Sequence, residues 1–195
     1  MCMIVKELNV KCFALKKNFE KLQMEELNRV SIEEFKQCTK IPVIVILDNV
    51  RSAQNVGSVF RTSDAFLIEK IYLCGITCKP PHKEIHKTAL GAQNSIDWEF
   101  YEQGLDAVEN AKKQGFTIIS IEQVTNSTFL QNFTIDTAQK YALVFGNEVF
   151  GVSDEILAVS DSCIEIPQFG TKHSCNVSVS CGIVLWDFAK AYLCS

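Results

Sequence analysis

Short, uninterrupted runs of apolar residues recur along the chain, and the segments between them place apolar residues at helical spacing. Apolar runs of about four to eight residues are typical of strands. The predicted strands span residues 43–47, 70–74, 116–121, 141–145 and 163–166. Because these runs do not alternate with polar residues, we expect the strands to be buried on both faces.

Helices are predicted between these strands. They span residues 18–37 (one helix or a pair), 56–66, 104–114, 153–159 and 175–193, with a further short helix after Pro81. Ser31 and Glu34 have the spacing of a capping box, and Gly115 ends the helix that precedes it. The last helix is apolar almost all round, which is typical of a helix buried on most of its faces.

The alternation of strands and helices indicates an α/β fold with a mostly parallel sheet flanked by helices. In such folds ligands bind at the loops that follow the carboxyl ends of the strands. Three of these loops are chemically unusual, namely those after Leu47, Phe145 and Ile166. The functional residues are therefore expected in these three loops.

Composition and charge narrow the class of protein. The chain has 195 residues, of which 47% are hydrophobic and 22% charged, and its formal net charge is −4. These values exclude a disordered or collagen-like chain. The overall charge gives no sign of nucleic-acid binding, but residues 70–91 carry four Lys and two His against one acid. Such a local basic patch can hold a phosphate backbone although the whole chain is acidic.

The nine cysteines predict a reducing environment. Several lie inside apolar runs, and no C-x-x-C pair occurs. We therefore expect reduced thiols that pack as small hydrophobic groups. The N-terminal segment has no signal-peptide core, and no apolar run is long enough to span a bilayer. The sequence predicts a cytoplasmic chain without a membrane segment.

The first unusual loop holds two Asn and two Arg within 13 positions: Asn49, Arg51, Asn55 and Arg61. Arg is suited to bidentate phosphate contacts, and Gly57 lets a backbone approach closely or a helix start tightly. Taken singly, Asn55 could cap the helix and Arg61 could pair with Asp64 at i+3. Taken together, the four residues favour a ligand site.

The other two loops also combine glycine with polar side chains. In FGNEVFG, Asn147 and Glu148 stand between two glycines directly after a strand; the alternative to a ligand site is a simple strand-to-helix turn. The spacing is neither that of a phosphate loop nor that of a dinucleotide fingerprint. In the third loop Ser174, Asn176 and Ser178 stand at the start of an apolar helix. Capping the helix requires fewer polar side chains than these three.

A metal site is not expected. His82 and His86 have the i, i+4 spacing of two ligands on a helix, but no third ligand accompanies them. We assign both to the surface or to RNA contact. His173 is expected to be a loop residue without a catalytic role.

Together the three loops resemble the motifs of the SpoU/TrmH-type RNA 2′-O-ribose methyltransferases of the SPOUT class. The first motif, N-x-R-x-x-x-N-x-G-x-x-x-R, is matched by Asn49, Arg51, Asn55, Gly57 and Arg61. The second, G-x-E after a strand, is matched by residues 146–148. The third, I-P, a loop and S-L-N-V-S, is matched by residues 166–167 and 174–178, with Cys175 in place of the usual Leu.

The resemblance implies a fold that periodicity does not reveal. The sheet would end in a C-terminal deep trefoil knot (SPOUT, or alpha/beta knot), whose loops bind S-adenosylmethionine (AdoMet) in a bent form. The site would form across a homodimer. Residues 1–40 would be an N-terminal helical extension and residues 41–195 the methyltransferase domain. The reaction would be methylation of a ribose 2′-hydroxyl of RNA without a metal, with tRNA favoured over rRNA.

The resemblance also implies residue roles. Arg61 would be catalytic; a guanidinium is a poor base, so it would position a phosphate and stabilise the developing alkoxide while phosphate or solvent takes the proton. Asn55 would orient Arg61 or the ribose, and Glu148 and Ser174 would shape the RNA side. The expected cofactor-binding residues are Phe145, Gly146, Ile166, Cys175 and Asn176. The expected RNA contacts are Arg51, Lys79, Lys83 and Lys87.

Other functions fit parts of this pattern. A non-catalytic RNA-binding protein of the same fold would be expected to lack Arg61 or the Gly146 loop, and both are present. A different α/β enzyme that binds a nucleotide would bind the cofactor without RNA-dependent turnover. A structural protein is disfavoured because the polar residues cluster at three strand ends.

Overall fold

The computed structural model describes residues 21–23, 26, 30–172 and 174–194. Across these residues seven strands form one parallel sheet in the order β3-β2-β1-β6-β4-β7-β5. The strands are β1 (Ile41–Asp48), β2 (Ile68–Cys74), β3 (Asp97–Tyr101), β4 (Phe116–Ile121), β5 (Thr128–Phe129), β6 (Lys140–Phe145) and β7 (Ser162–Glu165). The predicted α/β fold is confirmed.

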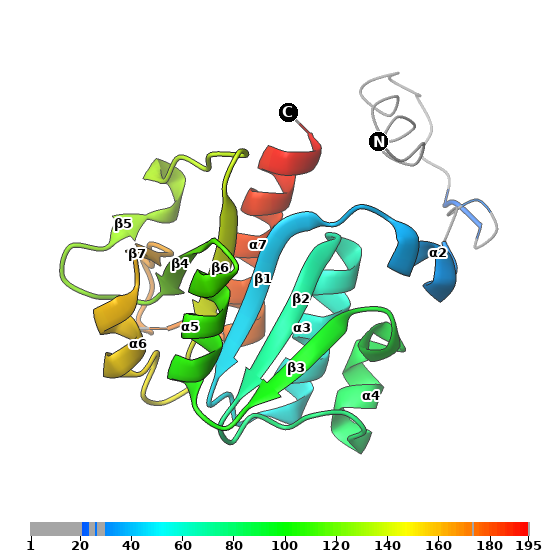
Figure 1. The fold of residues 1–195 in the computed structure, drawn as a ribbon, viewed down its shortest axis with the longest axis horizontal. Coiled ribbons are helices and arrows are strands. Elements are labelled where there is room, and N and C mark those ends of the chain that lie inside the picture. Colours follow the sequence, from blue (N-terminus) through cyan, green and yellow to red (C-terminus); the bar gives the residue numbers. More distant parts are fainter. Residues whose placement is uncertain (1–20, 24–25, 27–29, 173, 195) are drawn as a thin grey trace.

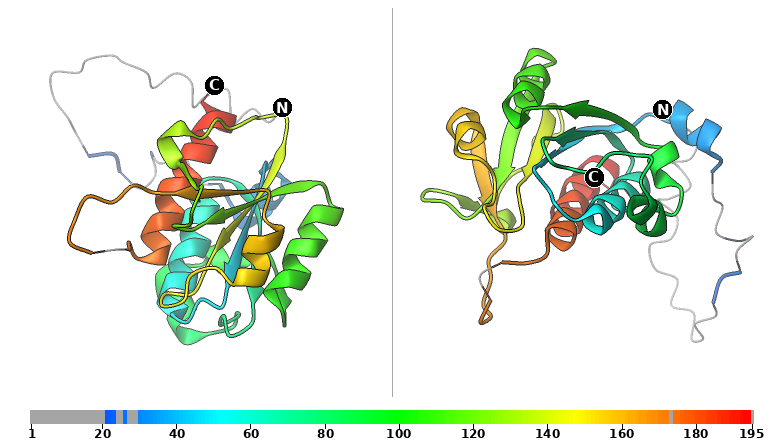
Figure 2. Two further views of the ribbon diagram at one scale, coloured as in Figure 1. Left: turned by 90° about the vertical axis from the view of Figure 1, so that its left-hand side faces the viewer. Right: turned by 90° about the horizontal axis from the view of Figure 1, so that it is seen from below.

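Helices cover both faces of the sheet (Figures 1 and 2). They are α2 (Ile32–Gln37), α3 (Ala53–Ala65), α4 (Lys83–Ala89), α5 (Gly104–Lys113), α6 (Asp154–Val159) and α7 (Val177–Leu193), with 3-10 turns η2 (Ala92–Asn94) and η3 (Leu130–Asn132). Helices α3, α4 and α7 lie on one face, and α5 and α6 lie on the other. Each face has its own apolar cluster, one containing Phe60 and Phe188 and the other Tyr72 and Val108.

The central strands have the continuous burial that their apolar runs predict. Residues Val43 to Leu47 of β1 are buried without exception, and so are Tyr141 to Phe145 of β6. Burial on both faces accounts for the lack of polar alternation, because helices cover each face. Strands β3 and β5 were not predicted; β3 has the sequence DWEFY, whose acids interrupt any apolar run, and β5 has only two residues.

Two helix starts differ from the prediction. Helix α3 begins at Ala53, because the Ser52 hydroxyl accepts from Asn55 N over 3.3 Å and so caps the helix. The idea that Asn55 is the cap is therefore wrong. Helix α7 begins at Val177 with Asn176 as its N-cap, so Ser174 and Cys175 precede the helix.

The N-terminal prediction is confirmed in part. Ser31 and Glu34 form the expected capping box at the start of α2. A helix was predicted over residues 18–37. Among the described residues of this segment, the structure has an α-helix at Ile32–Gln37. Most of the other residues of the segment lie outside the described residues. Within the described chain, no helix combines the length and apolar character that crossing a membrane requires.

Gly57 has a packing role. A Cβ at this position would lie 2.1 Å from Thr88 Oγ1 and 2.5 Å from the Ile85 carbonyl oxygen. Only glycine therefore allows α3 and α4 to approach so closely. The contact is reinforced by the Thr88 hydroxyl, which donates to the Gln54 carbonyl over 3.0 Å. This packing holds α4 and its lysines next to the first loop.

Two cysteines behave as the small hydrophobic groups that were predicted. Cys74 and Cys181 are fully buried within the apolar clusters. Burial raises the pKa of the Cys74 thiol to about 12, with a further contribution from nearby Asp48, and burial also raises the pKa of Cys181. Both thiols therefore stay protonated and unreactive at neutral pH.

Candidate active site

The Glu148 carboxylate joins the loop after β6 to the loop after β1. Glu148 Oε2 accepts from Arg51 N over 2.9 Å, and Oε1 accepts from Ser52 N over 3.0 Å and from Asn55 Nδ2 over 3.1 Å. Both carboxylate oxygens are thus held by N–H donors at the start of α3. The loops meet because β1 and β6 are neighbours in the sheet.

These donors change the acidity of Glu148. Partial burial acts to raise its pKa, but the backbone N–H groups of Arg51 and Ser52 and the Asn55 amide lower it by more. The pKa therefore lies below the ordinary value of a glutamic acid. The side chain is a carboxylate at neutral pH, and its oxygens already have partners.

Asn55 also connects to the third loop. Asn176 Nδ2 donates to Asn55 Oδ1 over 3.1 Å. The side-chain oxygen of Asn176, Oδ1, in turn accepts from Ser178 N over 2.8 Å and from Ser178 Oγ over 2.6 Å. The chain of contacts Glu148–Asn55–Asn176 therefore links all three loops that the sequence singled out.

Asn147 shapes the second loop. Its Nδ2 donates to the Asn49 carbonyl over 2.7 Å, and its Oδ1 accepts from the N–H groups of Val149 and Phe150. Asn147 and Gly151 also form an antiparallel bridge. A Cβ on Gly146 would lie 2.0 Å from the Gly151 carbonyl carbon, so the loop closes tightly only with glycine there.

A cavity of about 380 Å³ opens between the loops that follow β4, β6 and β7. All five residues expected to bind the cofactor line it: Phe145, Gly146, Ile166, Cys175 and Asn176. Glu148 and Ser174 line it as well. Four further lining residues were not predicted from the sequence, namely Ile121, Glu122, Gln123 and Glu165. These lie at the ends of β4 and β7, so the rule that ligands bind at carboxyl ends of strands could have found them.

Arg61 lies away from this cavity within one chain. It is six residues beyond Asn55, about 9 Å along α3 and about 120° around it. Its side chain is exposed, like those of Gln54 and Ala65 on the same strip of the helix. The pairing with Asp64 that the sequence left open is not formed; the Asp64 carboxylate instead accepts from the Ser95 hydroxyl.

Comparison with known proteins now decides the family. The model of the SpoU rRNA Methylase family matches residues 42–186. The chain belongs to the SpoU rRNA Methylase family. The matched span contains every residue of the network and the cavity described above.

Two relatives of this SpoU-family chain are named as tRNA methyltransferases. It is 32% identical to the tRNA (guanosine(18)-2′-O)-methyltransferase of Aquifex aeolicus over 74% of this chain and 67% of that protein. It is 28% identical to the Borreliella burgdorferi enzyme of the same name over 73% of this chain, and it spans 63% of that relative's length.

Solved structures share the fold. The structure of the Aquifex aeolicus TrmH/SpoU tRNA modifying enzyme matches with a TM-score of 0.71 and 27% identity, over 83% of this chain and 81% of that one. An AdoMet-bound rRNA methyltransferase from Sinorhizobium meliloti matches with a TM-score of 0.73 and 24% identity, over 83% of this chain and 61% of that one.

The three lysines expected to contact RNA lie on α4 or shortly before it. Lys79, Lys83 and Lys87 are all exposed. Lys79 Nζ lies 3.9 Å from the centre of the Phe100 ring, and Lys87 Nζ lies 2.6 Å from Glu84 Oε1. Lys83 makes no ion pair with any described residue, so it is the most available of the three for a phosphate.

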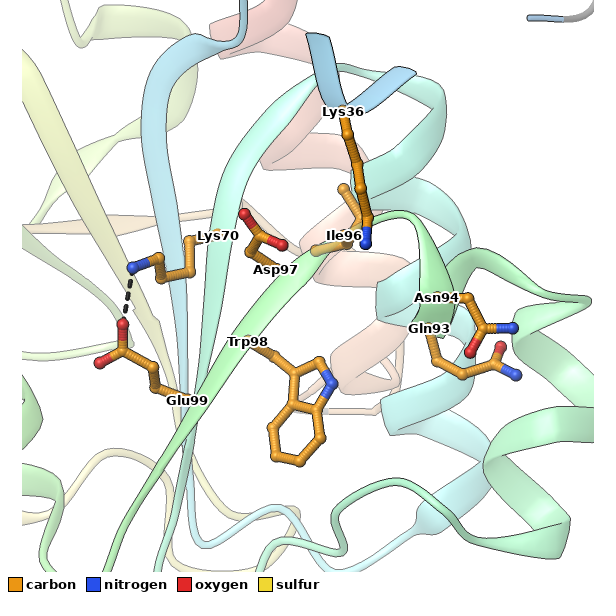
Figure 3. A pocket seen from close by; sticks show the side chains of 8 residues that line it. All are labelled: Lys36, Lys70, Gln93, Asn94, Ile96, Asp97, Trp98 and Glu99. Atoms are coloured by element: carbon orange, nitrogen blue, oxygen red, sulfur yellow. Dashed lines mark hydrogen bonds and ion pairs between the residues drawn. The ribbon is translucent and has the colours of Figure 1, made fainter. Parts of the chain in front are cut away.

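A second hollow, of about 420 Å³, lies beside β3 and is unrelated to the family motifs (Figure 3). Its lining includes Lys36, Lys70, Asp97, Trp98 and Glu99. Lys70 Nζ lies 2.6 Å from Glu99 Oε1. The two Lys and the two acids balance, and none of the predicted site residues lines this hollow.

Proposed function

We propose that this chain is an AdoMet-dependent RNA methyltransferase that modifies a ribose 2′-hydroxyl. The observation that carries the proposal is the Glu148–Asn55–Asn176 network, which ties the motif loop after β1 to the two motif loops that line the cavity. A simple strand-to-helix turn after β6 would not need its carboxylate tied to the loop after β1. Family membership and the names of the relatives support the same reaction class.

The residues present fit AdoMet. The cavity volume falls in the range of small-molecule sites, about 300–1,000 Å³. Phe145, Ile166 and Val177 offer apolar surface for an adenine ring, and the glycine-containing loop after β6 offers backbone groups. Cys175 lines the cavity and is apolar enough to replace the family's Leu. When bound there, AdoMet supplies a methyl group on a positively charged sulfur.

The C-terminal trefoil knot is part of this proposal. The segment between β7 and α7 lines the same cavity as the loop after β6, so the two segments lie side by side. A knot formed by these segments would place Ile166 and Cys175 against Gly146. Residues 41–195 are proposed as the methyltransferase domain and residues 1–40 as an N-terminal extension.

The chain's own residues are assigned distinct roles. Arg61 orients the RNA phosphate and stabilises the negative charge that develops on the ribose oxygen. Glu148 does not act as the base, because its pKa is lowered and both oxygens accept hydrogen bonds. It braces the start of α3, while the proton leaves to phosphate or solvent. Ser174 and Asn176 hold the wall of the cavity.

The proposal includes a homodimer. Val179, Ile183 and Trp186 form an exposed apolar stripe along α7, with 53%, 40% and 52% of their surface exposed. Helix α3 packs beside α7, and Phe66 contacts Trp186 with ring centres 5.7 Å apart. A Cβ on Gly182 of α7 would lie 4.0 Å from Thr62 Cγ2, and Thr62 is the neighbour of Arg61 on α3. A second copy that covers the stripe would bring Arg61 toward the partner's cavity.

Bound RNA would lie across the positive residues near the site. Arg51, Lys79, Lys83 and Lys87 would contact its phosphates, which gives salt-sensitive affinity without base readout. A tRNA is the proposed substrate, because the matched Aquifex and Borreliella relatives are named for tRNA. A cytoplasmic location is part of the same proposal.

The experiment is transfer of labelled methyl from AdoMet to unmodified tRNA and, separately, to unmodified rRNA, followed by nucleoside analysis. The proposal expects a 2′-O-methylated nucleoside from tRNA. A methylated base, or no transfer to either RNA by protein that binds AdoMet, would contradict it. Label in rRNA alone would support the proposed reaction but would show that rRNA, and not tRNA, is the substrate.

A further inference from the structure

The cavity carries an unusual charge. Three of its lining residues are Glu122, Glu148 and Glu165, and none of the described lining residues is Lys, Arg or His. The hollow beside β3 differs, because two Lys accompany its two acids (Figure 3). Carboxylates around a small concave site concentrate negative potential within it. The cavity therefore suits a ligand with a positive charge.

Glu148 contributes least to this potential. Its oxygens face the N–H groups of Arg51 and Ser52 and the Asn55 amide, so local donors offset much of its charge. Glu122 accepts from two backbone N–H groups, so its charge is offset in part, whereas the Glu165 carboxylate accepts from none among the described residues. The network uses neither of these two residues.

Glu122 lies against the cavity wall. Its Oε2 accepts from Val152 N over 3.0 Å and its Oε1 from Gln123 N over 2.9 Å. A Cβ on Gly151 would lie 2.2 Å from Glu122 Oε2, so the carboxylate touches this cavity-lining glycine. Two backbone donors fix its position.

Glu165, at the end of β7, has no hydrogen bond or ion pair to its side chain among the residues that the structure describes. Its charge is thus not offset by any basic partner in this part of the chain. Glu165 is the last residue of β7 and Glu122 directly follows β4, and these two strands are adjacent in the sheet. Both therefore act on the same end of the cavity.

We propose that Glu122 and Glu165 make this cavity select the sulfonium cofactor over its thioether product by charge. The inference rests on the proposed cofactor and not on the identity of the RNA. Methyl transfer breaks the carbon–sulfur bond, leaves its electron pair on sulfur and forms a carbon–oxygen bond to the ribose. The hydroxyl proton passes to phosphate or solvent, so the positive charge leaves the cavity. S-adenosylhomocysteine then lacks the attraction that held AdoMet, and its release is favoured.

The test is calorimetric measurement of the Kd values of AdoMet and S-adenosylhomocysteine at low and high salt. The variants are Glu165→Gln and Glu122→Gln, with Glu109→Gln as the matched control, because Glu109 is exposed on α5 outside the cavity. Glu122→Asp keeps the negative charge but shortens the side chain, so it distinguishes an effect of charge on binding from an effect of side-chain size on the loop. Glu165→Gln should weaken AdoMet about fivefold and S-adenosylhomocysteine less than about twofold. The AdoMet effect should shrink at high salt.

Equal weakening of both ligands, or no change in either, would overturn the inference. Failure of the wild type to bind AdoMet would overturn it as well. Charge-selective binding by a protein that methylates no RNA would uphold the inference and contradict the proposed function. RNA methylation by a protein whose variants lose no selectivity between AdoMet and S-adenosylhomocysteine would uphold the proposed function and contradict the inference.

Discussion

The Asn55 amide donates to Glu148 Oε1 over 3.1 Å, although the two residues are 93 positions apart in the sequence. The contact spans the adjacent strands β1 and β6, where Leu47 is in register with Phe145. Because Asn55 also accepts from Asn176, this one side chain connects all three loops by hydrogen bonds. The site therefore depends on hydrogen bonds between loops as much as on the residues that would touch a substrate.

Acid should weaken the protein partly through Glu148. Partial burial acts to raise the pKa of this carboxyl, but the Arg51 and Ser52 N–H groups and the Asn55 amide lower it by more, so it lies below the ordinary value of a glutamic acid. Because the folded pKa is depressed, the stabilisation is present above the unfolded pKa and is lost as the pH falls through the folded value. Urea denaturation from about pH 6 to about pH 3 should show a smaller loss of unfolding free energy in Glu148→Gln than in the wild type. Parallel curves for the two proteins would contradict this role, and Glu109→Gln serves as the control.

Gly146→Ala should disrupt the cavity. The added methyl would lie 2.0 Å from the Gly151 carbonyl carbon and 2.1 Å from Val152 N, so backbone must move. We expect a loss of about 1–3 kcal/mol in stability, as for overpacked sites, and AdoMet affinity reduced at least about tenfold. Gly170→Ala is the control, because its methyl would meet nothing within 4 Å. Thermal denaturation and calorimetry measure both effects, and wild-type binding by Gly146→Ala would refute the expectation.

Ile183→Glu and Trp186→Glu should prevent dimerisation. Each places a charge in the apolar stripe of α7, where burial against a second copy would be costly. Analytical ultracentrifugation should show a dimer for the wild type and a monomer for both variants. Phe129→Glu, on β5 outside the stripe, should remain dimeric; its side chain is 43% exposed. A monomeric wild type, or variants that stay dimeric, would rule out this interface.

Substitutions of Lys83 and Lys87 should change the salt dependence of RNA binding by different amounts, because only Lys87 has an ion-pair partner among the described residues. Lys83 forms no ion pair within the described chain, whereas Lys87 pairs with Glu84. If both contact RNA phosphates, Lys83→Ala should reduce the slope of log K against log salt by about one unit, and Lys87→Ala by less. Filter binding to tRNA over a salt series measures the slope. Slopes unchanged in both variants would remove α4 from the RNA interface.

The sequence predicted the central sheet because its strands are buried on both faces. Strands β1, β4 and β6 are continuous apolar runs, and such runs need no tertiary context to be recognised. Strand β3 escaped because it lies at the sheet edge, where Asp97 and Glu99 are tolerated. Its stability comes from pairing with β2, which no local pattern reveals.

The site was predicted as a set of residues, but its connections were not. Nothing in the sequence says that Glu148 accepts from two backbone N–H groups some 97 and 96 positions away. The cap of α3 was assigned to Asn55 as an alternative, whereas Ser52 fills it and frees the Asn55 side chain. Glu122 and Glu165 belong to none of the three motifs, so their position in the cavity could be recognised only once the strand order was known.

The most direct test of the account compares wild type and Arg61→Ala in methyl transfer to unmodified tRNA, with AdoMet affinity measured on the same preparations. Arg61 does not line the cavity of its own chain, so AdoMet binding should be unchanged. Loss of the charge that stabilises the ribose oxygen should lower kcat at least about 100-fold, and Arg61→Lys should recover only part of it. A variant that forms the 2′-O-methylated nucleoside at the wild-type rate would show that Arg61 is a surface residue and would contradict the proposed mechanism.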